Sequence, residues 1–293
     1  MANKKLNKII KKTKSLIDLP YNKFNMDNYL KILNNNYPKI EFIKTDKNLP
    51  IQLMSGNHPN AGIVKLGKGK IYLIGKGVNF DSGGMDLKIR GMADMTNDKT
   101  GMLIALAVAK LLPKKVTAVC PVTTNFINFS KIIPGDELKI GKKIVKVTNT
   151  DAEGRLILAE ALDTLRLDKN DIVITIATLT GAVAYAIGNR ATGVFSTSNE
   201  LLKKYSEASF EAKEYAWGLP LWDYLEEAYY SKKTIVNSTS KIKCGATEAA
   251  LFVKQFVPNS NNWIHLDIAY SAFSDGKANG VPIRSLINFI KKL

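Results

Sequence analysis

From residue 70 onwards, short hydrophobic runs alternate with segments of helical periodicity. The runs are rich in β-branched residues and end in glycine or polar residues, which is typical of strands buried on both faces. Strands are expected at residues 70–77, 116–124, 171–181 and 263–269, a hairpin at 138–147, and helices at 99–113, 153–167, 199–215, 221–231, 246–257 and 282–293. This order predicts an α/β fold, with a mixed, largely parallel central sheet flanked by helices.

Residues 1–65 differ from this pattern, because Asn, Lys and Pro are frequent and the extended pieces are short. The start of the chain predicts an amphipathic, lysine-rich surface helix, since its apolar residues recur at helical spacing. These are Leu6, Ile9, Ile10, Leu16 and Ile17. The segment lacks the continuous apolar core of a secretory signal. We therefore expect a short N-terminal lead-in or linker remnant at 1–65 and the main domain at 66–293.

The composition indicates a globular protein, with 45% hydrophobic and 23% charged residues. No apolar run approaches the ~20 residues that span a bilayer, so no membrane partner is expected. Cys120 and Cys244 lie far apart in apolar settings, which indicates buried thiols in a reducing compartment and hence a cytoplasmic location. The net charge of +16 permits nucleic-acid binding, but the chain has no dense basic block interleaved with aromatics, so nucleic acid is possible but not favoured.

Three polar clusters lie where predicted strands end or helices begin, and reactive groups of α/β sheets gather beyond strand ends. They contain Lys76, Asp81 and Lys88; Asp94 and Asp98; and Asp151, Glu153 and Arg155. Each also has a simple structural interpretation. The first could be a tight glycine-rich turn, the second a helix cap, and the third an N-cap with an acidic first turn. Spacing alone leaves these alternatives open, although a cap places Arg155 at the unfavourable end of the helix dipole.

Only two histidines are present, His58 and His265. A histidine-rich zinc site or a Ser-His-Asp triad would have to use one of them, and is therefore nearly excluded. His265 lies in the hydrophobic run WIHLDIA and is expected to be a hydrogen-bonded core residue. Any metal-assisted hydrolysis must then rely on oxygen ligands, and clustered carboxylates that bind two divalent ions provide such a site.

Two segments carry a specific resemblance. NTDAEGRL at 149–156 closely resembles the signature of the leucyl aminopeptidase (cytosol aminopeptidase) family, and GKGVNFDSGGMDLK at 75–88 resembles its metal-binding loop. Weaker similarity continues in the family's order through ATLTGA, WGLPLWDYL, WIHLDIA and GVPIRSL, over roughly residues 70–293. The long N-terminal domain typical of the family is absent from this sequence, so the resemblance is to a member with a shortened N-terminal region.

The resemblance implies a dinuclear metallo-aminopeptidase, a hydrolase that removes N-terminal residues, preferably apolar and leucine-like, from short peptides. It implies two divalent metal ions, zinc or manganese, that activate a water as the nucleophile. By the family's pattern, Lys76 and Asp98 would bind the more labile ion. Asp81 and Glu153 would bind both ions, and Asp151 would complete the tighter site.

The resemblance also implies roles around the metals. Lys88 would polarise the scissile carbonyl and stabilise the oxyanion, and Arg155 would hold a bicarbonate that acts as general base. The implied substrate pocket consists of Met95, Thr178, Leu179, Gly181 and Ala269. The implied assembly is a homohexamer, and residues 66–293 would form the catalytic domain.

The chain departs from the family pattern around Asp98. One residue fewer separates Lys88 from Asp98, and the run Asp-Lys-Thr-Gly at 98–101 replaces an Asp-Met-x-Gly run. Tyr270 and Ala272 stand where Gly and Met are usual. The alternative interpretation is therefore a catalytically weak relative that acts as a basic nucleic-acid- or protein-binding hexamer.

Overall fold

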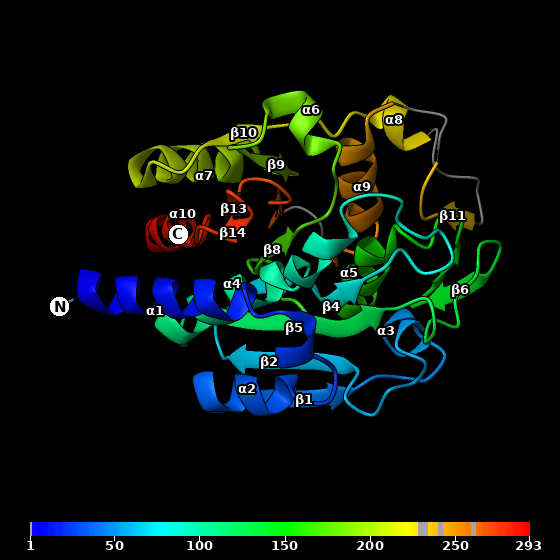
Figure 1. Ribbon diagram of the computed structural model, residues 1–293. Coiled ribbons are helices and arrows are strands. Elements are labelled where there is room, and N and C mark those ends of the chain that lie inside the picture. The colour runs from blue at the N-terminus through cyan, green and yellow to red at the C-terminus, as the bar shows by residue number, and fades with distance from the viewer. Residues whose placement is uncertain (1, 228–233, 240–242, 259–261) are drawn as a thin grey trace.

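A mixed β-sheet forms the centre of the computed structural model, which describes residues 2–227, 234–239, 243–258 and 262–293 (Figure 1). Nine strands within these residues have the order β1-β2-β5-β3-β8-β12-β9-β10, with β4 paired to β5. Their bounds are β1 Glu41–Lys44, β2 Gly62–Gly67, β3 Ile71–Gly75, β4 Gly77–Asp81, β5 Val116–Asn125, β8 Ile172–Ala177, β9 Thr192–Ser196, β10 Ala216–Gly218 and β12 Trp263–Asp267.

The middle of this sheet is parallel. Strands β5, β3, β8 and β12 run in one direction, whereas β2 lies antiparallel to β5 and β9 lies antiparallel to β12. All ten residues of β5 are buried, as expected for a strand covered on both faces. The predicted fold class is therefore confirmed.

Helices cover both faces of the sheet (Figure 1). One layer contains α1 Ala2–Ile17, α4 Thr100–Leu111, α7 Asn199–Ala212 and α10 Ile283–Lys292, which pack on one another. The other layer contains α3 Pro50–Met54, α5 Glu153–Asp163 and α9 Gly245–Lys254. Three short helices, α2 Tyr29–Asn36, α6 Val183–Ile187 and α8 Asp223–Glu227, lie outside these layers. No helix among the described residues is long and apolar enough to cross a membrane.

Most predicted elements are confirmed, including the hairpin, which forms β6 Glu137–Ile140 and β7 Lys143–Lys146. Together with β11 Thr234–Val236, this hairpin makes a second, three-stranded sheet. The helix predicted at 221–231 is described only as α8, and residues 228–231 lie outside the described residues. The bend predicted after β3 is wrong for residues 77–81, which form β4, because Val78 and Asn79 are buried and the segment pairs with β5.

The first 65 residues contribute to the same core. Helix α1 forms as predicted, and Leu16 and Ile17 at its end are buried in the main hydrophobic core. Strand β1 pairs with β2 at the edge of the central sheet. Cys120 is buried as predicted, whereas Cys244 is only half-buried, and the two do not form a disulfide.

Candidate active site

The predicted site residues meet at the carboxyl ends of the parallel strands. Lys76 follows β3, Asp81 ends β4, Thr178 follows β8, and Ala269 lies just beyond β12. They line one cavity of about 540 Å³. Loops at this edge lie close together because parallel neighbours end on the same side of the sheet.

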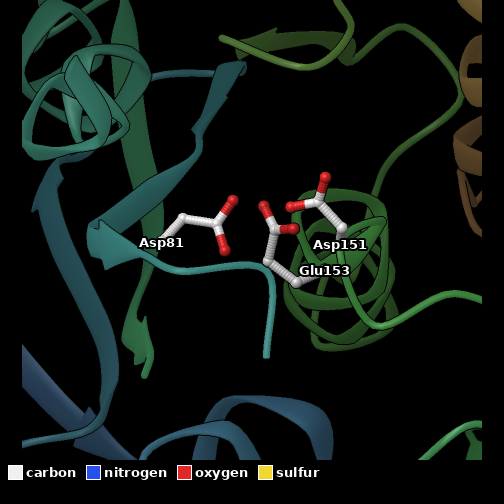
Figure 2. Close-up of side chains that lie close together, drawn as sticks. All are labelled: Asp81, Asp151 and Glu153. Carbon is white, nitrogen blue, oxygen red and sulfur yellow. The ribbon is translucent and has the colours of Figure 1, made fainter. Parts of the chain in front are cut away.

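Three carboxylates converge in this cavity (Figure 2). Asp81 reaches in from the end of β4, whereas Asp151 and Glu153 come from the start of α5. One oxygen from each lies within 4.8 Å of the others. Asp81 and Glu153 are only 2% exposed, so water screens their mutual repulsion poorly.

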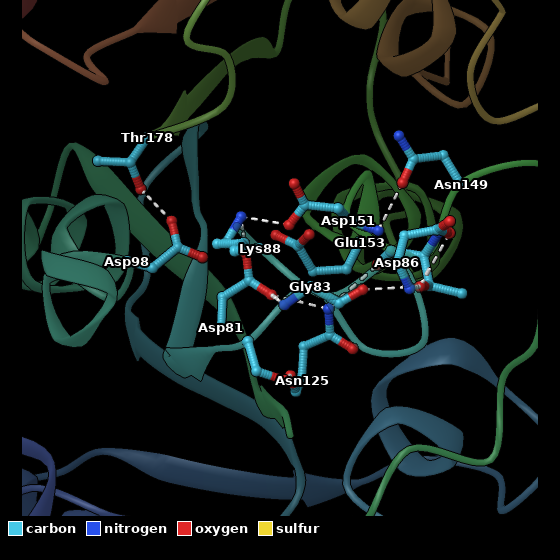
Figure 3. A network of polar contacts seen from close by, with 12 residues as sticks. Asp81, Gly83, Asp86, Lys88, Asp98, Asn125, Asn149, Asp151, Glu153 and Thr178 are labelled. Atoms are coloured by element: carbon cyan, nitrogen blue, oxygen red, sulfur yellow. Dashed lines mark hydrogen bonds and ion pairs between the residues drawn. The ribbon is translucent and has the colours of Figure 1, made fainter. Parts of the chain in front are cut away.

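Two lysines, Lys76 and Lys88, hold the carboxylates together, and Figure 3 shows Lys88 among them. The Nζ atom of Lys76 lies 2.7 Å from Oδ2 of Asp98 and 2.8 Å from Oε1 of Glu153. The Nζ atom of Lys88 lies 2.8 Å from Oδ2 of Asp81 and also contacts Asp151. We refer to Asp81, Asp98, Asp151 and Glu153 as the carboxylate cluster. In this arrangement each ammonium group lies between two carboxylates of the cluster.

The charges of the cluster shift the pKa values of its members. Burial lowers the pKa of Lys76, but the carboxylates of Asp98 and Glu153 outweigh it, so that this pKa lies above its ordinary value. Lys88 behaves in the same way, through Asp81 and Glu153. Burial raises the pKa of Asp98 to about 7 even though Lys76 opposes it, and burial also raises the pKa of Asp151. The cluster therefore needs positive charge to stay ionised.

Neither Asp98 nor Asp151 caps a helix, although Glu153 does lie in the first turn of α5, as the alternative interpretation expected. The N-cap of α4 is Lys99, and no side chain caps that end. Asp98 instead accepts a hydrogen bond of 2.6 Å from Oγ1 of Thr178. The N-cap of α5 is Ala152, also without a side-chain cap. Free of capping, the carboxylates of Asp98, Asp151 and Glu153 all line the cavity.

A second set of polar contacts fixes the loop after β4. Oδ1 of Asp81 accepts hydrogen bonds from the backbone N–H of Gly83 (2.8 Å) and from Nδ2 of Asn125 (2.7 Å). Thr150 donates to the carbonyl of Gly83 (2.7 Å), and its backbone N–H donates to Asp86 (2.7 Å). These bonds tie the loop that carries Lys88 to the segment that carries Asp151.

Glycine is required at position 154, directly after Glu153. A Cβ atom there would lie 2.5 Å from Cε of Lys76 and 2.8 Å from its Nζ. Any side chain would therefore push the lysine away from the carboxylate cluster.

All five predicted pocket residues line the cavity: Met95, Thr178, Leu179, Gly181 and Ala269. Six further lining residues were not predicted as part of the pocket, namely Asn97, Thr180, Asn189, Tyr270, Phe273 and Asp275. Asp267 was not predicted either; it is buried at the end of β12 and accepts a hydrogen bond of 2.7 Å from Oγ1 of Thr180. Burial raises the pKa of Asp267 to about 6. Its position at a strand end was the one available signal.

Arg155 and His265 lie behind this cavity and are absent from its lining. Arg155 is buried on α5, and its Nη1 donates to the carbonyl of Asn237 (2.6 Å) and to Glu248 (3.3 Å). His265 is a core residue as predicted, with a hydrogen bond of 2.8 Å between its Nδ1 and Oγ1 of Thr175. Burial lowers the pKa of His265 to about 3, which keeps the ring neutral.

The carboxylate cluster fits divalent metal ions. Oε2 of Glu153 is buried and has no hydrogen-bond partner among the described residues, so it can still bind a cation. Carboxylate oxygens are suitable ligands for Zn²⁺ or Mn²⁺, and so is the Nζ atom of Lys76 once it has lost a proton, which bound cations would favour. The residues present can therefore hold such ions.

Comparison with known proteins agrees with this geometry. Residues 58–287 match the model of the cytosol aminopeptidase family, catalytic domain. The chain belongs to the cytosol aminopeptidase family. It is 40% identical over 239 residues to a probable cytosol aminopeptidase of Chlorobium phaeobacteroides, covering 77% of this chain and 48% of that protein. It is also 41% identical over 220 residues to a probable cytosol aminopeptidase of Chloroherpeton thalassium, and this match covers 72% of this chain and 43% of that protein. The chain thus spans about half the length of these curated relatives.

Solved structures share the fold of this family member. The bottromycin maturation enzyme BotP superimposes with a TM-score of 0.83 at 25% identity, covering 98% of this chain and 69% of BotP. A structure of BotP in complex with Mn gives a TM-score of 0.85 at 24% identity, covering 98% of this chain and 70% of BotP. Because these structures cover 98% of this chain, the likeness extends into the segment before residue 58, which the family model does not match.

Proposed function

We propose that this chain is a metal-dependent aminopeptidase that hydrolyses N-terminal residues from short peptides. The observation that carries the proposal is the carboxylate cluster with Lys76, which lines a cavity in a cytosol aminopeptidase catalytic domain. The acidic lining contrasts with the net charge of +16 and suits a substrate with a free, cationic α-amine.

Two divalent ions, Zn²⁺ or Mn²⁺, would be held by Lys76, Asp81, Asp98, Asp151 and Glu153. When bound, such ions acidify a water molecule and polarise a carbonyl group. The orphaned Oε2 of Glu153 and the contact of Lys76 with both Asp98 and Glu153 support this ligand set. Of these ligands, Asp98 would also face the α-amine of the substrate.

Lys88 would stabilise the oxyanion. Its ammonium group lies at the cavity wall, where Asp81 and Asp151 fix it in place, so it can hold a positive charge beside a carbonyl oxygen. By the family resemblance, Arg155 would hold a bicarbonate that acts as general base; it lies on α5, two residues after Glu153, and is not among the residues that line the cavity.

Met95, Thr178, Leu179, Gly181 and Ala269 would bind the side chain of the first residue. The apolar members of this set support a preference for leucine-like residues. We further propose a cytoplasmic homohexamer, with residues 66–293 as the catalytic domain and residues 1–65 as its lead-in. All of the proposed ligands lie within residues 66–293.

The test is hydrolysis of leucyl-p-nitroanilide by the full chain, first stripped of metal and then supplied with Mn²⁺ or Zn²⁺. We expect turnover that depends on the added metal. Absence of turnover by metal-loaded protein, over a panel of aminoacyl substrates, would contradict the proposal and favour a binding protein.

A further inference from the structure

Lys99 is a fully buried lysine that the proposed chemistry does not use. It follows Asp98 directly, yet it is 0% exposed and is absent from the cavity lining. A lysine is seldom buried unless its amine is hydrogen-bonded. The groups that the amine of Lys99 contacts therefore indicate which segments of the chain it holds together.

Two of those contacts, with Leu19 and Phe24, lie in the first 25 residues of the chain. The Nζ atom of Lys99 donates to the carbonyl of Leu19 (3.0 Å) and to that of Thr96. It also lies 5.3 Å from the centre of the Phe24 ring, which is fully buried. Leu19 lies two residues beyond the end of α1, where a cation is stabilised by the helix dipole and by unsatisfied carbonyls. The lysine thus joins the end of α1 to the loop that ends at Asp98.

The end of α1 is itself fixed. Leu16 and Ile17 are buried in the core, and Oδ1 of Asp18 accepts a hydrogen bond of 2.9 Å from the backbone N–H of Ala278. Ala278 belongs to the hairpin of β13 Phe273–Ser274 and β14 Lys277–Ala278, whose turn lines the cavity. The end of α1 therefore contacts the loop before α4, through Lys99, and the β13–β14 hairpin that lines the cavity, through Asp18.

We propose that Lys99, Leu19 and Phe24 form an anchor that positions Asp98 as a metal ligand, so that Lys99 is a positioning residue. The inference rests on the proposed function, because it takes Asp98 as a ligand of the more labile ion. Asp98 follows the short 3-10 helix Met92–Asn97, none of whose residues is buried. The carbonyl of Asp98 accepts a hydrogen bond of 3.3 Å from the backbone N–H of Val78 in β4, so the anchor would hold this loop from the side opposite in sequence, through α1. Without the anchor, the loop would sample positions in which Asp98 leaves Lys76.

The test is calorimetric titration of Mn²⁺ into metal-free full chain, comparing wild type with Lys99→Met. The substitution keeps an unbranched side chain against Phe24 but removes the donor. We expect the dissociation constant of the second ion to rise about tenfold, as is typical when a residue supporting a metal ligand is lost, with little change for the first ion. Amide hydrogen exchange in residues 91–98 should accelerate.

Lys110→Met is the matched control. Lys110 lies on α4 and resembles Lys99 in its contacts, because it donates to the carbonyl of Asn36 at the end of α2 and lies 5.5 Å from the centre of the Tyr37 ring. It differs in being solvent-exposed and twelve residues away from Asp98 in the sequence. We expect wild-type affinity for both ions in this variant. If Lys99→Met does not fold, Phe24→Leu replaces it, with an expected rise of about threefold in the second constant.

Three results would overturn the anchor. The first is an unchanged affinity for the second ion in the Lys99 variant, or in the Phe24 variant that replaces it. The second is an equal loss of affinity for both ions in that variant, and the third is the same loss of affinity in the Lys110 control. A wild-type chain that binds fewer than two ions would instead contradict the proposed function itself, and the anchor with it.

Discussion

Helix α5 carries two buried glutamates that have opposite surroundings. Glu153 and Glu160 lie about two turns apart, and each is 2% exposed. Glu160 accepts a hydrogen bond of 2.7 Å from the backbone N–H of Ile51, at the start of α3, and forms no ion pair among the described residues. Glu153 pairs with Lys76 and faces two other carboxylates.

The comparison shows that burial of an acid does not by itself mark a functional site. Burial raises the pKa of Glu160 to about 8, so at neutral pH this residue is largely protonated and acts as a neutral cap for α3. Both glutamates line a cavity, but only around Glu153 do lysines alternate with carboxylates. The functional site around Glu153 therefore differs from the cap formed by Glu160 in having several carboxylates close together, with lysines between them.

The largest difference between the two glutamates should appear in turnover. Glu153→Gln should lower kcat by about 10³-fold or more, because a ligand proposed to bind both ions loses its charge. Glu160→Gln is the matched control and should change kcat by no more than about twofold at pH 7, where the wild-type residue is already largely neutral. Steady-state kinetics with added Mn²⁺, with circular dichroism to verify folding, checks both. Equal losses in the two variants would remove the distinction.

Lys88→Met should separate catalysis from metal binding within the cluster. Loss of the proposed oxyanion contact should lower kcat by about 10²–10³-fold, while the metal content stays at the wild-type level. Metal analysis of the protein after desalting, alongside the kinetics, provides the measurement. A rise in KM with unchanged kcat would show that Lys88 binds the substrate and transition state equally.

The pH dependence of stability should report on Glu160. Its pKa is higher in the folded state (about 8) than the ordinary 4.5, so the folded state binds the proton more tightly. Its stabilising contribution is therefore complete below about pH 4.5 and is lost as the pH rises towards 8. Relative to Glu160→Gln, wild type should lose at most about 1.4 kcal/mol per pH unit across this window. Urea unfolding of both chains at pH 5, 6.5 and 8 measures the difference, and parallel curves would contradict the assignment.

The smallest expected effect concerns Arg155, two residues after Glu153. Arg155→Lys keeps the charge but loses the planar guanidinium, and should lower kcat by about tenfold. Added bicarbonate should increase kcat of the wild type and have little effect on the variant. If bicarbonate does not change kcat of the wild type, in buffers freed of carbon dioxide, the bicarbonate role is wrong, and contacts such as those to Asn237 and Glu248 make Arg155 a structural residue.

Much of the fold could be predicted because its strands are buried on both faces. Strand β5 is one continuous apolar and β-branched run, so its periodicity needs no tertiary information. Strand β4 could not be predicted, because Gly77 and the polar residues after Asn79 suggest a turn. Only pairing with β5, forty residues further on in the chain, makes this segment a strand.

The site was predictable because segments 75–88 and 149–156 resemble motifs of the family, whereas the spacing of Asp151 and Glu153 alone also allowed a helix cap. Tyr270 and Asp275 were missed because they reach the cavity only through the path of the chain after β12. Lys99 was missed for a different reason. Nothing local distinguishes a buried lysine from a solvated one, and its partners Leu19 and Phe24 are about eighty residues away.

The most direct test of the central claim is anomalous diffraction from crystals grown with Mn²⁺. The account predicts two peaks in the cavity, one contacted by Asp81, Asp151 and Glu153, and one contacted by Lys76 and Asp98 together with Asp81 and Glu153. Anomalous peaks at other carboxylates would contradict the account. So would the absence of any peak in the cavity, if the same protein hydrolyses leucyl-p-nitroanilide.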